Sequence, residues 1–234
     1  MNPLFFSKPV LFPRPRSYAN DIQRQGVELL CRRIAELLHA AALIDGTEPG
    51  LLTNEERDTA RRRGAASAKR ALADGASGGK PHIAYYRALT GAGFMPAVMT
   101  IPKLADRLWV LEDRCGLADS YLRSAADTAL QRGAEVILCP SPLRRDRLEA
   151  VFFPGARAAF LSGRAAAEVN CAEVRGVHLD RIPEAERRRA LRGAMKENRR
   201  MMDALVGRAA LYLTNAQLLC DMDSDTCVDG MKQI

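Results

Sequence analysis

Residues 107–139 constrain the fold of this chain more than any other segment, because they predict a strand, a helix and a second strand in succession. The apolar runs RLWVLE (107–112) and AEVILC (134–139) flank an amphipathic stretch at 119–132. Gly133 follows that stretch, at the position where helices often end on a glycine. Two strands joined through a helix form a βαβ unit, in which the strands are parallel. We therefore predict an α/β protein with a parallel sheet flanked by helices.

Helices are also predicted at both ends of the chain. Apolar residues recur every three or four positions over residues 18–43, as on one face of a helix. Thr53 and Glu56 match a capping box, so a second helix is expected over residues 54–73 and the two helices are predicted to form a hairpin. A long C-terminal helix is expected over residues 183–220. Further short apolar runs predict strands at 83–90, 148–153, 156–162 and 174–179.

These patterns divide the chain into three parts. Residues 1–17 are rich in proline and are expected to be extended or poorly ordered. Residues 18–80 are predicted to hold the helical hairpin and a glycine-rich connector, and residues 81–234 the α/β domain. No apolar run approaches the ~20 residues that cross a bilayer, and the N-terminus lacks a signal-peptide pattern. A cytoplasmic protein without membrane association and with reduced cysteines is therefore expected.

The net charge of +7 makes an anionic partner worth considering, since 29 of the 35 basic residues are arginine. A basic surface can attract nucleic acid. The sequence has no zinc-finger spacing and no basic run interleaved with aromatic residues. The simpler interpretation is therefore that the arginines form solvated helical faces, and nucleic-acid binding stays an alternative. The six cysteines and three histidines show no metal-ligand spacing, so no metal site is predicted.

The loop between the first strand and its helix occupies the position of a phosphate-binding P-loop. The P-loop pattern is G-x-x-x-x-G-K-[ST], and residues 113–120 align with it. Of the defining positions, Ser120 alone matches. Asp113 replaces the first glycine, Ala118 the second, and Asp119 the lysine. The pattern by itself therefore does not identify a P-loop.

The order of motifs around this loop carries more information. The chain shows LWVLED, the loop, a helix ending in QRG at 131–133, a strand ending in VILCP at 136–140, and apolar strands that contain FFP at 152–154 and AAFLS at 158–162. In this order, over about residues 25–231, it resembles the second half of a bacterial family of uncharacterised tandem P-loop ATPase-like proteins. The resemblance implies a P-loop NTPase-like fold, with ATP and Mg²⁺ as the ligands of intact members.

The departures from the family pattern bear directly on activity. Glycines let backbone N–H groups surround a phosphate, while the lysine supplies positive charge. Asp119 instead places a carboxylate where the phosphate would lie, and Asp113 adds a second one. We therefore expect hydrolysis to be lost, with no catalytic or metal-binding residue and no required cofactor. If ATP with Mg²⁺ still binds, the candidate residues are Arg114, the Gly116 amide and Ser120.

Three functions are therefore considered. The first is a non-catalytic P-loop-like domain that acts through contacts with a protein partner or through self-association, since the family's intact first half has no counterpart here. The second is a nucleotide or phosphometabolite binder that uses Arg114, Gly116 and Ser120. The third is a basic nucleic-acid-binding protein, whose affinity would fall steeply with salt.

Overall fold

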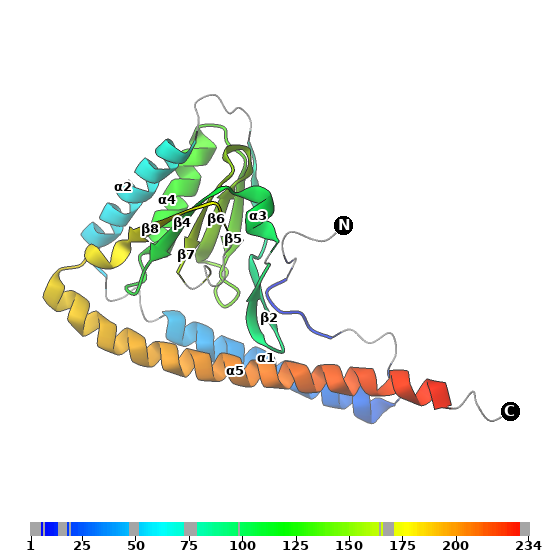
Figure 1. Cartoon of the computed structure of the whole chain (residues 1–234). Coiled ribbons are helices and arrows are strands. Elements are labelled where there is room, and N and C mark those ends of the chain that lie inside the picture. The colour runs from blue at the N-terminus through cyan, green and yellow to red at the C-terminus, as the bar shows by residue number, and fades with distance from the viewer. Residues whose placement is uncertain are drawn as a thin grey trace.

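The computed structural model describes most of the chain, and Figure 1 shows its arrangement. The described residues are 6, 8–13, 18, 20–46, 52–72, 79–97, 99–163, 165 and 171–229, with the backbone alone for 222–229. Much of the predicted extended segment at 1–17 and most of the glycine-rich connector lie outside these residues. None of the described helices is long and apolar enough to cross a membrane.

Six strands form one sheet in the middle of the molecule (Figure 1). In chain order they are β1 (Pro81–Ile83), β4 (Arg107–Glu112), β5 (Val136–Pro140), β6 (Leu148–Phe153), β7 (Ala158–Ser162) and β8 (Glu173–His178). Their order across the sheet is β1-β5-β6-β7-β4-β8. β6 runs antiparallel to both its neighbours, whereas the other neighbouring strands are parallel.

The α/β class is thus confirmed, but the expectation of a wholly parallel sheet is wrong at β6. Residues 141–147 join β5 to β6, and residues 154–157 join β6 to β7. Such short connections can return the chain as an antiparallel hairpin, whereas parallel neighbours need a crossover of a dozen or more residues. Strand direction here therefore follows from connection length.

The predicted strand–helix–strand unit is present. Helix α4 (Ala118–Gln131) joins β4 to β5, and these strands point the same way with β7 and β6 between them. Gly133 has φ 75° and its N–H donates to the carbonyl of Leu130 at 2.9 Å, which ends the helix as the glycine predicted. Tyr121, Leu122 and Ala125 of α4 are fully buried against the sheet.

The two N-terminal helices do not pack against each other as the predicted hairpin would. Helix α1 (Asp21–Gly46) lies along the long helix α5 (Ala185–Asp229), while α2 (Asn54–Ala71) lies along α4 (Figure 1). Gly64 explains the second pairing, because a Cβ there would stand 2.2 Å from the carbonyl oxygen of Tyr121. The apolar stripe of α1 is covered instead by Ala209 and Leu213 of α5. The capping box of Thr53 and Glu56 is present at the start of α2.

The predicted strand at 83–90 is divided between two sheets. β1 ends at Ile83, whereas β2 (Arg87–Thr90) pairs with β3 (Gly93–Pro96) in a separate hairpin. Leu89 of this hairpin packs with Ile34 of α1 and Leu213 of α5. The hairpin therefore connects the sheet domain to the two long helices. A short helix, α3 (Thr100–Leu104), follows it on the same side of the sheet.

Candidate functional site

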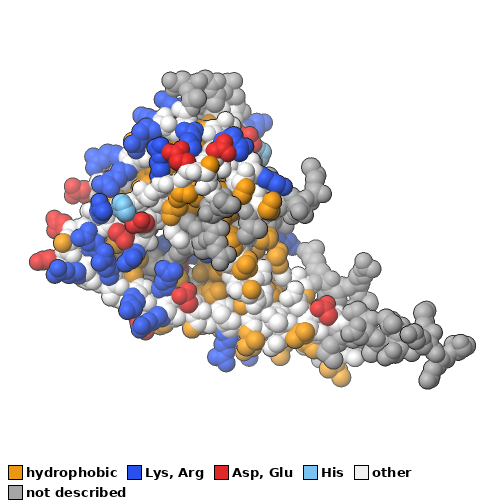
Figure 2. All heavy atoms as spheres, in the orientation of Figure 1, with side chains coloured by type: hydrophobic (Ala, Val, Ile, Leu, Met, Phe, Trp, Pro, Cys, Tyr) orange, Lys and Arg blue, Asp and Glu red, His pale blue; other side chains and the backbone are white. Residues whose placement is uncertain are grey.

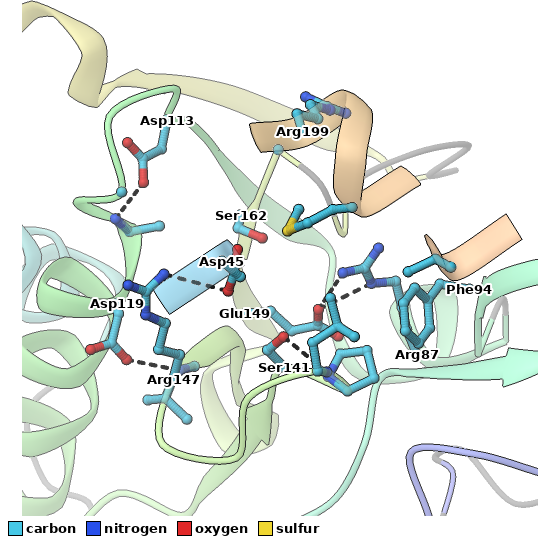
Figure 3. Close-up of a pocket in the computed structure, with 18 of the residues that line it drawn as sticks. Asp45, Arg87, Phe94, Asp113, Asp119, Ser141, Arg147, Glu149, Ser162 and Arg199 are labelled. Atoms are coloured by element: carbon cyan, nitrogen blue, oxygen red, sulfur yellow. Dashed lines mark hydrogen bonds and ion pairs between the residues drawn. The ribbon is translucent and has the colours of Figure 1, made fainter. Parts of the chain in front are cut away.

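A cavity of about 190 Å³ lies at the carboxyl ends of β4, β5 and β7 (Figure 3). This edge of an open α/β sheet is where such folds bind their ligands. The β4–α4 loop, the β5–β6 loop, the β2–β3 hairpin and the end of α1 all contribute to its walls. Met195, Arg199 and Met202 of α5 also line it. The expected helix over residues 183–220 therefore helps to enclose the site.

The carboxylate of Asp113 fills the amide cradle at the start of α4. Its Oδ1 accepts the N–H of Cys115 at 2.9 Å. Its Oδ2 accepts the N–H of Ala118 at 2.6 Å, which is drawn as a dashed line in Figure 3. Gly116 has φ 82°, a left-handed conformation that lets the loop curl around the carboxylate. Free amides at a helix N-terminus favour an anion. Here the chain supplies that anion itself.

Burial raises the pKa of the Asp113 carboxyl above its ordinary value. Hydrogen bonds from the amides of Ala118, Leu117 and Cys115 oppose this rise, and the charge of Asp180 adds to it. The folded protein therefore holds a proton on Asp113 more readily than the unfolded chain does. Asp113 thus contributes most to stability at low pH, and this contribution is lost as the pH rises through its raised pKa.

Asp119, at the lysine position of the family pattern, connects α4 to the sheet. Its Oδ1 accepts the N–H of Leu148 at 2.8 Å, and the Nε of Arg123 donates to the same carboxylate at 3.0 Å. Leu148 is the first residue of β6. The carboxylate thus has a structural role, because it fixes the end of the β5–β6 loop against the first turn of α4.

The three binding residues predicted from sequence do not converge on the cavity. Gly116 lines it. The side chain of Arg114 is 71% exposed, and its Nε lies 3.6 Å from Oδ2 of Asp180 in a neighbouring hollow. Ser120 is half-buried in the first turn of α4 and is not part of the cavity wall. Their arrangement therefore differs from a phosphate site in which all three face one ligand.

Two largely buried ion pairs line the cavity and were not predicted from sequence. Nη2 and Nε of Arg87 donate to Oε2 of Glu149 at 2.6 and 3.0 Å, and the two side chains are 16% and 4% exposed. Nη1 of Arg147 lies 3.5 Å from Oδ2 of Asp45, and both side chains are largely buried (Figure 3). The pairs join residues 62 and 102 positions apart, so no local pattern predicts them. The one available signal is Glu149 itself, a charge inside the otherwise apolar run LEAVFF.

The charge and size of the cavity both argue against a nucleotide. Five acidic residues line it, against three arginines: Asp45, Asp113, Asp119, Glu149 and Asp203, with Arg87, Arg147 and Arg199. Its volume is below the ~300–1,000 Å³ typical of small-molecule and cofactor sites. Among the residues that the structure describes, no three His, Cys, Asp or Glu side chains are placed to hold a metal ion.

Comparison with known proteins assigns no family. No family model, no curated protein and no solved structure matches this chain.

Cys115 lies in the loop but has the environment of an unreactive thiol. It is 1% exposed, and burial, with the nearby charge of Asp180, raises its pKa to about 12. Since the thiolate is the reactive form, we expect iodoacetamide near neutral pH to leave Cys115 unmodified in the folded protein, together with buried Cys139. Peptide mass spectrometry measures this, with half-exposed Cys171 as the internal reference and urea-unfolded protein as the positive control. Labelling of native Cys115 as fast as Cys171 would contradict the expectation.

Proposed function

We propose that this chain is a non-hydrolysing, P-loop-like α/β protein that acts through contacts with other proteins. One observation carries the proposal: the carboxylate of Asp113 accepts the amide hydrogens of Cys115 and Ala118, where a phosphate would have to bind. A nucleotide would have to displace this carboxylate from its own hydrogen bonds before it could enter.

Electrostatics support the same conclusion. A phosphate in the cradle would face Asp113 and Asp119 without the lysine that balances it in a working P-loop. Two like unit charges ~4 Å apart repel by ~1 kcal/mol in water and ~4 kcal/mol near a protein surface. Arg114, the nearest loop cation in sequence, pairs with Asp180 instead. The site therefore lacks the charge that phosphoryl transfer needs.

The helix pair of α1 and α5 supports a role in protein contacts. Ile22 and Leu29 on α1, and Leu211 and Leu218 on α5, are between 56% and 82% exposed. Each pair is spaced by seven residues and therefore lies on one side of its helix. Apolar side chains repeated in this way on a long helix are typical of surfaces that pack against other helices.

The direct test is calorimetric titration of the wild-type protein with MgATP, MgADP and MgGTP. We expect no heat of binding and no change of melting temperature at millimolar nucleotide, because the cradle is occupied by Asp113. Binding in the micromolar range would overturn the proposal and support the alternative of a nucleotide binder with a rebuilt loop.

The variant Asp113→Ala tests the cradle itself. We expect its free energy of unfolding at pH 7 to fall by about 1 kcal/mol. Two amides lose their acceptor, which destabilises the fold, and removal of the desolvated charge offsets part of this loss. The loss should grow as the pH falls toward ~4, since the raised pKa makes the wild-type carboxyl most favourable there. Thermal unfolding of the variant and the wild type at pH 7 and at pH ~4 measures both effects.

Phosphate should raise the melting temperature of Asp113→Ala and leave the wild type unchanged, because the emptied amides again favour an anion. Asp113→Asn is the matched control, since the amide side chain keeps an acceptor oxygen and should block phosphate as the wild type does. Equal phosphate stabilisation of all three proteins would show that the cradle is not the anion site.

A further inference from the structure

Most of the chain's net positive charge lies in one short stretch. Residues 181–200 contain eight Arg and Lys against three Glu, which is +5 of the chain's +7. Figure 2 shows basic side chains gathered over the first half of α5 and over α2, on the left of the view. The charge is therefore concentrated on one side of the molecule.

Within this stretch, four basic residues share one side of α5. Arg188, Arg192, Lys196 and Arg199 follow one another at steps of four, four and three residues, which places them in a row along the helix. Arg114, from the β4–α4 loop, lines two hollows beside α5 together with Arg192. Arg181, in the turn before α5, lines the larger hollow, which has a volume of about 380 Å³. We call these six residues the basic stripe.

Much of this positive charge is not neutralised within the chain. Arg181, Arg192 and Lys196 form no ion pair with any residue that the structure describes. The carboxylate of Glu112, which lines the same hollow, lies 2.6 Å from Nδ1 of His178. Asp180 is 15% exposed and already accepts the N–H of Arg114. The stripe therefore presents a surplus of cations to solvent.

We propose that the basic stripe binds the phosphate backbone of a nucleic acid without reading its bases. Guanidinium groups donate to phosphate oxygens in a fixed fork. Residues 188–199 span ~16 Å of helix, about the length of five phosphates along one strand of a duplex. Among the residues that line the two hollows, His178 is the one aromatic side chain, and it is paired with Glu112. The contacts of the stripe are therefore with the nucleic-acid backbone.

An anionic membrane fits this surface less well. Peripheral helices that bind membranes combine basic residues with exposed apolar ones that enter the lipid. Leu191 and Met195, the larger apolar side chains on this part of α5, are 5% and 8% exposed and belong to the core. An acidic protein also fits less well, because the regular charge spacing of a phosphate backbone matches the regular steps of the stripe.

The experiment is fluorescence anisotropy of the whole chain with a short labelled duplex DNA. We expect micromolar binding at about 50 mM salt and a logarithmic salt dependence with a slope of about −4 to −5, as for five phosphate contacts. The charge reversal Arg192→Glu with Lys196→Glu should weaken binding at least about tenfold and flatten the slope by about two units.

The matched control is Arg24→Glu with Arg208→Glu, which changes the net charge equally. Both residues are exposed, and neither belongs to the stripe. The control should bind as the wild type does, and melting curves should show that both variants are folded. The proposal is overturned if the wild type does not bind at about 50 mM salt, if both variants lose affinity equally, or if polyglutamate displaces DNA at equal charge.

The stripe borders the Asp113 cradle, because Asp113 lines the smaller hollow together with Arg192 and Lys196. The two proposals are separated by the variants used, since Asp113→Ala changes the cradle and the charge reversal of Arg192 and Lys196 changes the stripe. MgATP binding that persists in the charge reversal of Arg192 and Lys196 would overturn the proposed function and leave the stripe proposal unaffected. A wild type that does not bind DNA would overturn the stripe proposal and leave the proposed function unaffected.

Discussion

Replacing Arg87 by methionine is expected to lower the free energy of unfolding by about 3–5 kcal/mol. The guanidinium donates two hydrogen bonds to one oxygen of Glu149, whose side chain is 4% exposed. Methionine keeps much of the side-chain volume but leaves the buried carboxylate without its cation. Arg87 also lies 5.6 Å from the ring centroid of Phe94, so a smaller cation–π contribution is lost as well.

Chemical denaturation near pH 7 measures this loss, and the melting temperature should fall by about 10 °C. The control is the double variant Arg87→Met with Glu149→Met, which removes both charges. Replacing both members of a buried ion pair by apolar residues is often neutral, so we expect most of the lost stability to return. Single and double variants of equal stability would show that the ion pair is not what stabilises this position.

The ion pair also connects two parts of the fold, so its loss should affect one part before the other. Arg87 belongs to the β2–β3 hairpin and Glu149 to β6 in the main sheet. The pair therefore connects the sheet to the hairpin that packs on α1 and α5. We expect the single variant to loosen the hairpin first, which hydrogen exchange of the Leu89 amide would detect as faster exchange than in the double variant.

The variant Phe160→Ala is expected to cost about 3–5 kcal/mol, because it empties the centre of the aromatic core. Phe160 is fully buried on β7. Its ring centroid lies 4.8 Å from that of Trp109, 5.5 Å from that of Phe153 and 5.9 Å from that of Tyr121. These neighbours come from two further strands and from α4, so the cavity would weaken contacts between several elements.

Urea denaturation measures this loss. The slope of the unfolding free energy against urea concentration should stay unchanged, because the fold is retained. Phe160→Leu should cost less than half as much, since it keeps most of the apolar volume. Phe12→Ala is the second control, because that side chain is 40% exposed. It should change the free energy of unfolding by less than about 1 kcal/mol. Similar losses for Phe160→Ala and Phe12→Ala would contradict the assigned core.

The parts of the fold that depend on nearby residues could be predicted from the sequence. Thr53 and Glu56 predicted the start of α2, and Gly133 predicted the end of α4. The hydrogen bonds at these positions join residues at most four apart, so the residue types there are sufficient to specify them. The apolar runs at β4, β6 and β7 predicted core strands for the same reason, since each run is buried as one unit.

The sequence also indicated that the loop at 113–120 departs from the phosphate-site pattern. It did not indicate which groups the two carboxylates of the loop bind. Asp113 and Asp119 both stood out as carboxylates at P-loop positions. Only the folded loop decides that Asp113 turns inward to the amides while Asp119 turns toward Leu148. Both carboxylates are equally able to accept an N–H, so the choice depends on where the backbone places each donor.

What the sequence determined by itself was therefore the α/β class, the long helices and the core strands, with the start of α2 and the end of α4. The boundary between β1 and β2, and the elements β3 and α3, were not predicted. The tertiary structure decided the partners of α1 and α2, and the buried pairs of Arg87 with Glu149 and Arg147 with Asp45. The antiparallel direction of β6 agrees with the short connections on either side of it, which the sequence already contained. The physical reason is that the hydrophobic effect is not directional, so an apolar strand or helix face can be buried against many different partners. Close approach at small residues and ion pairs between residues far apart in the chain select among these partners, and both arise only once the chain has folded.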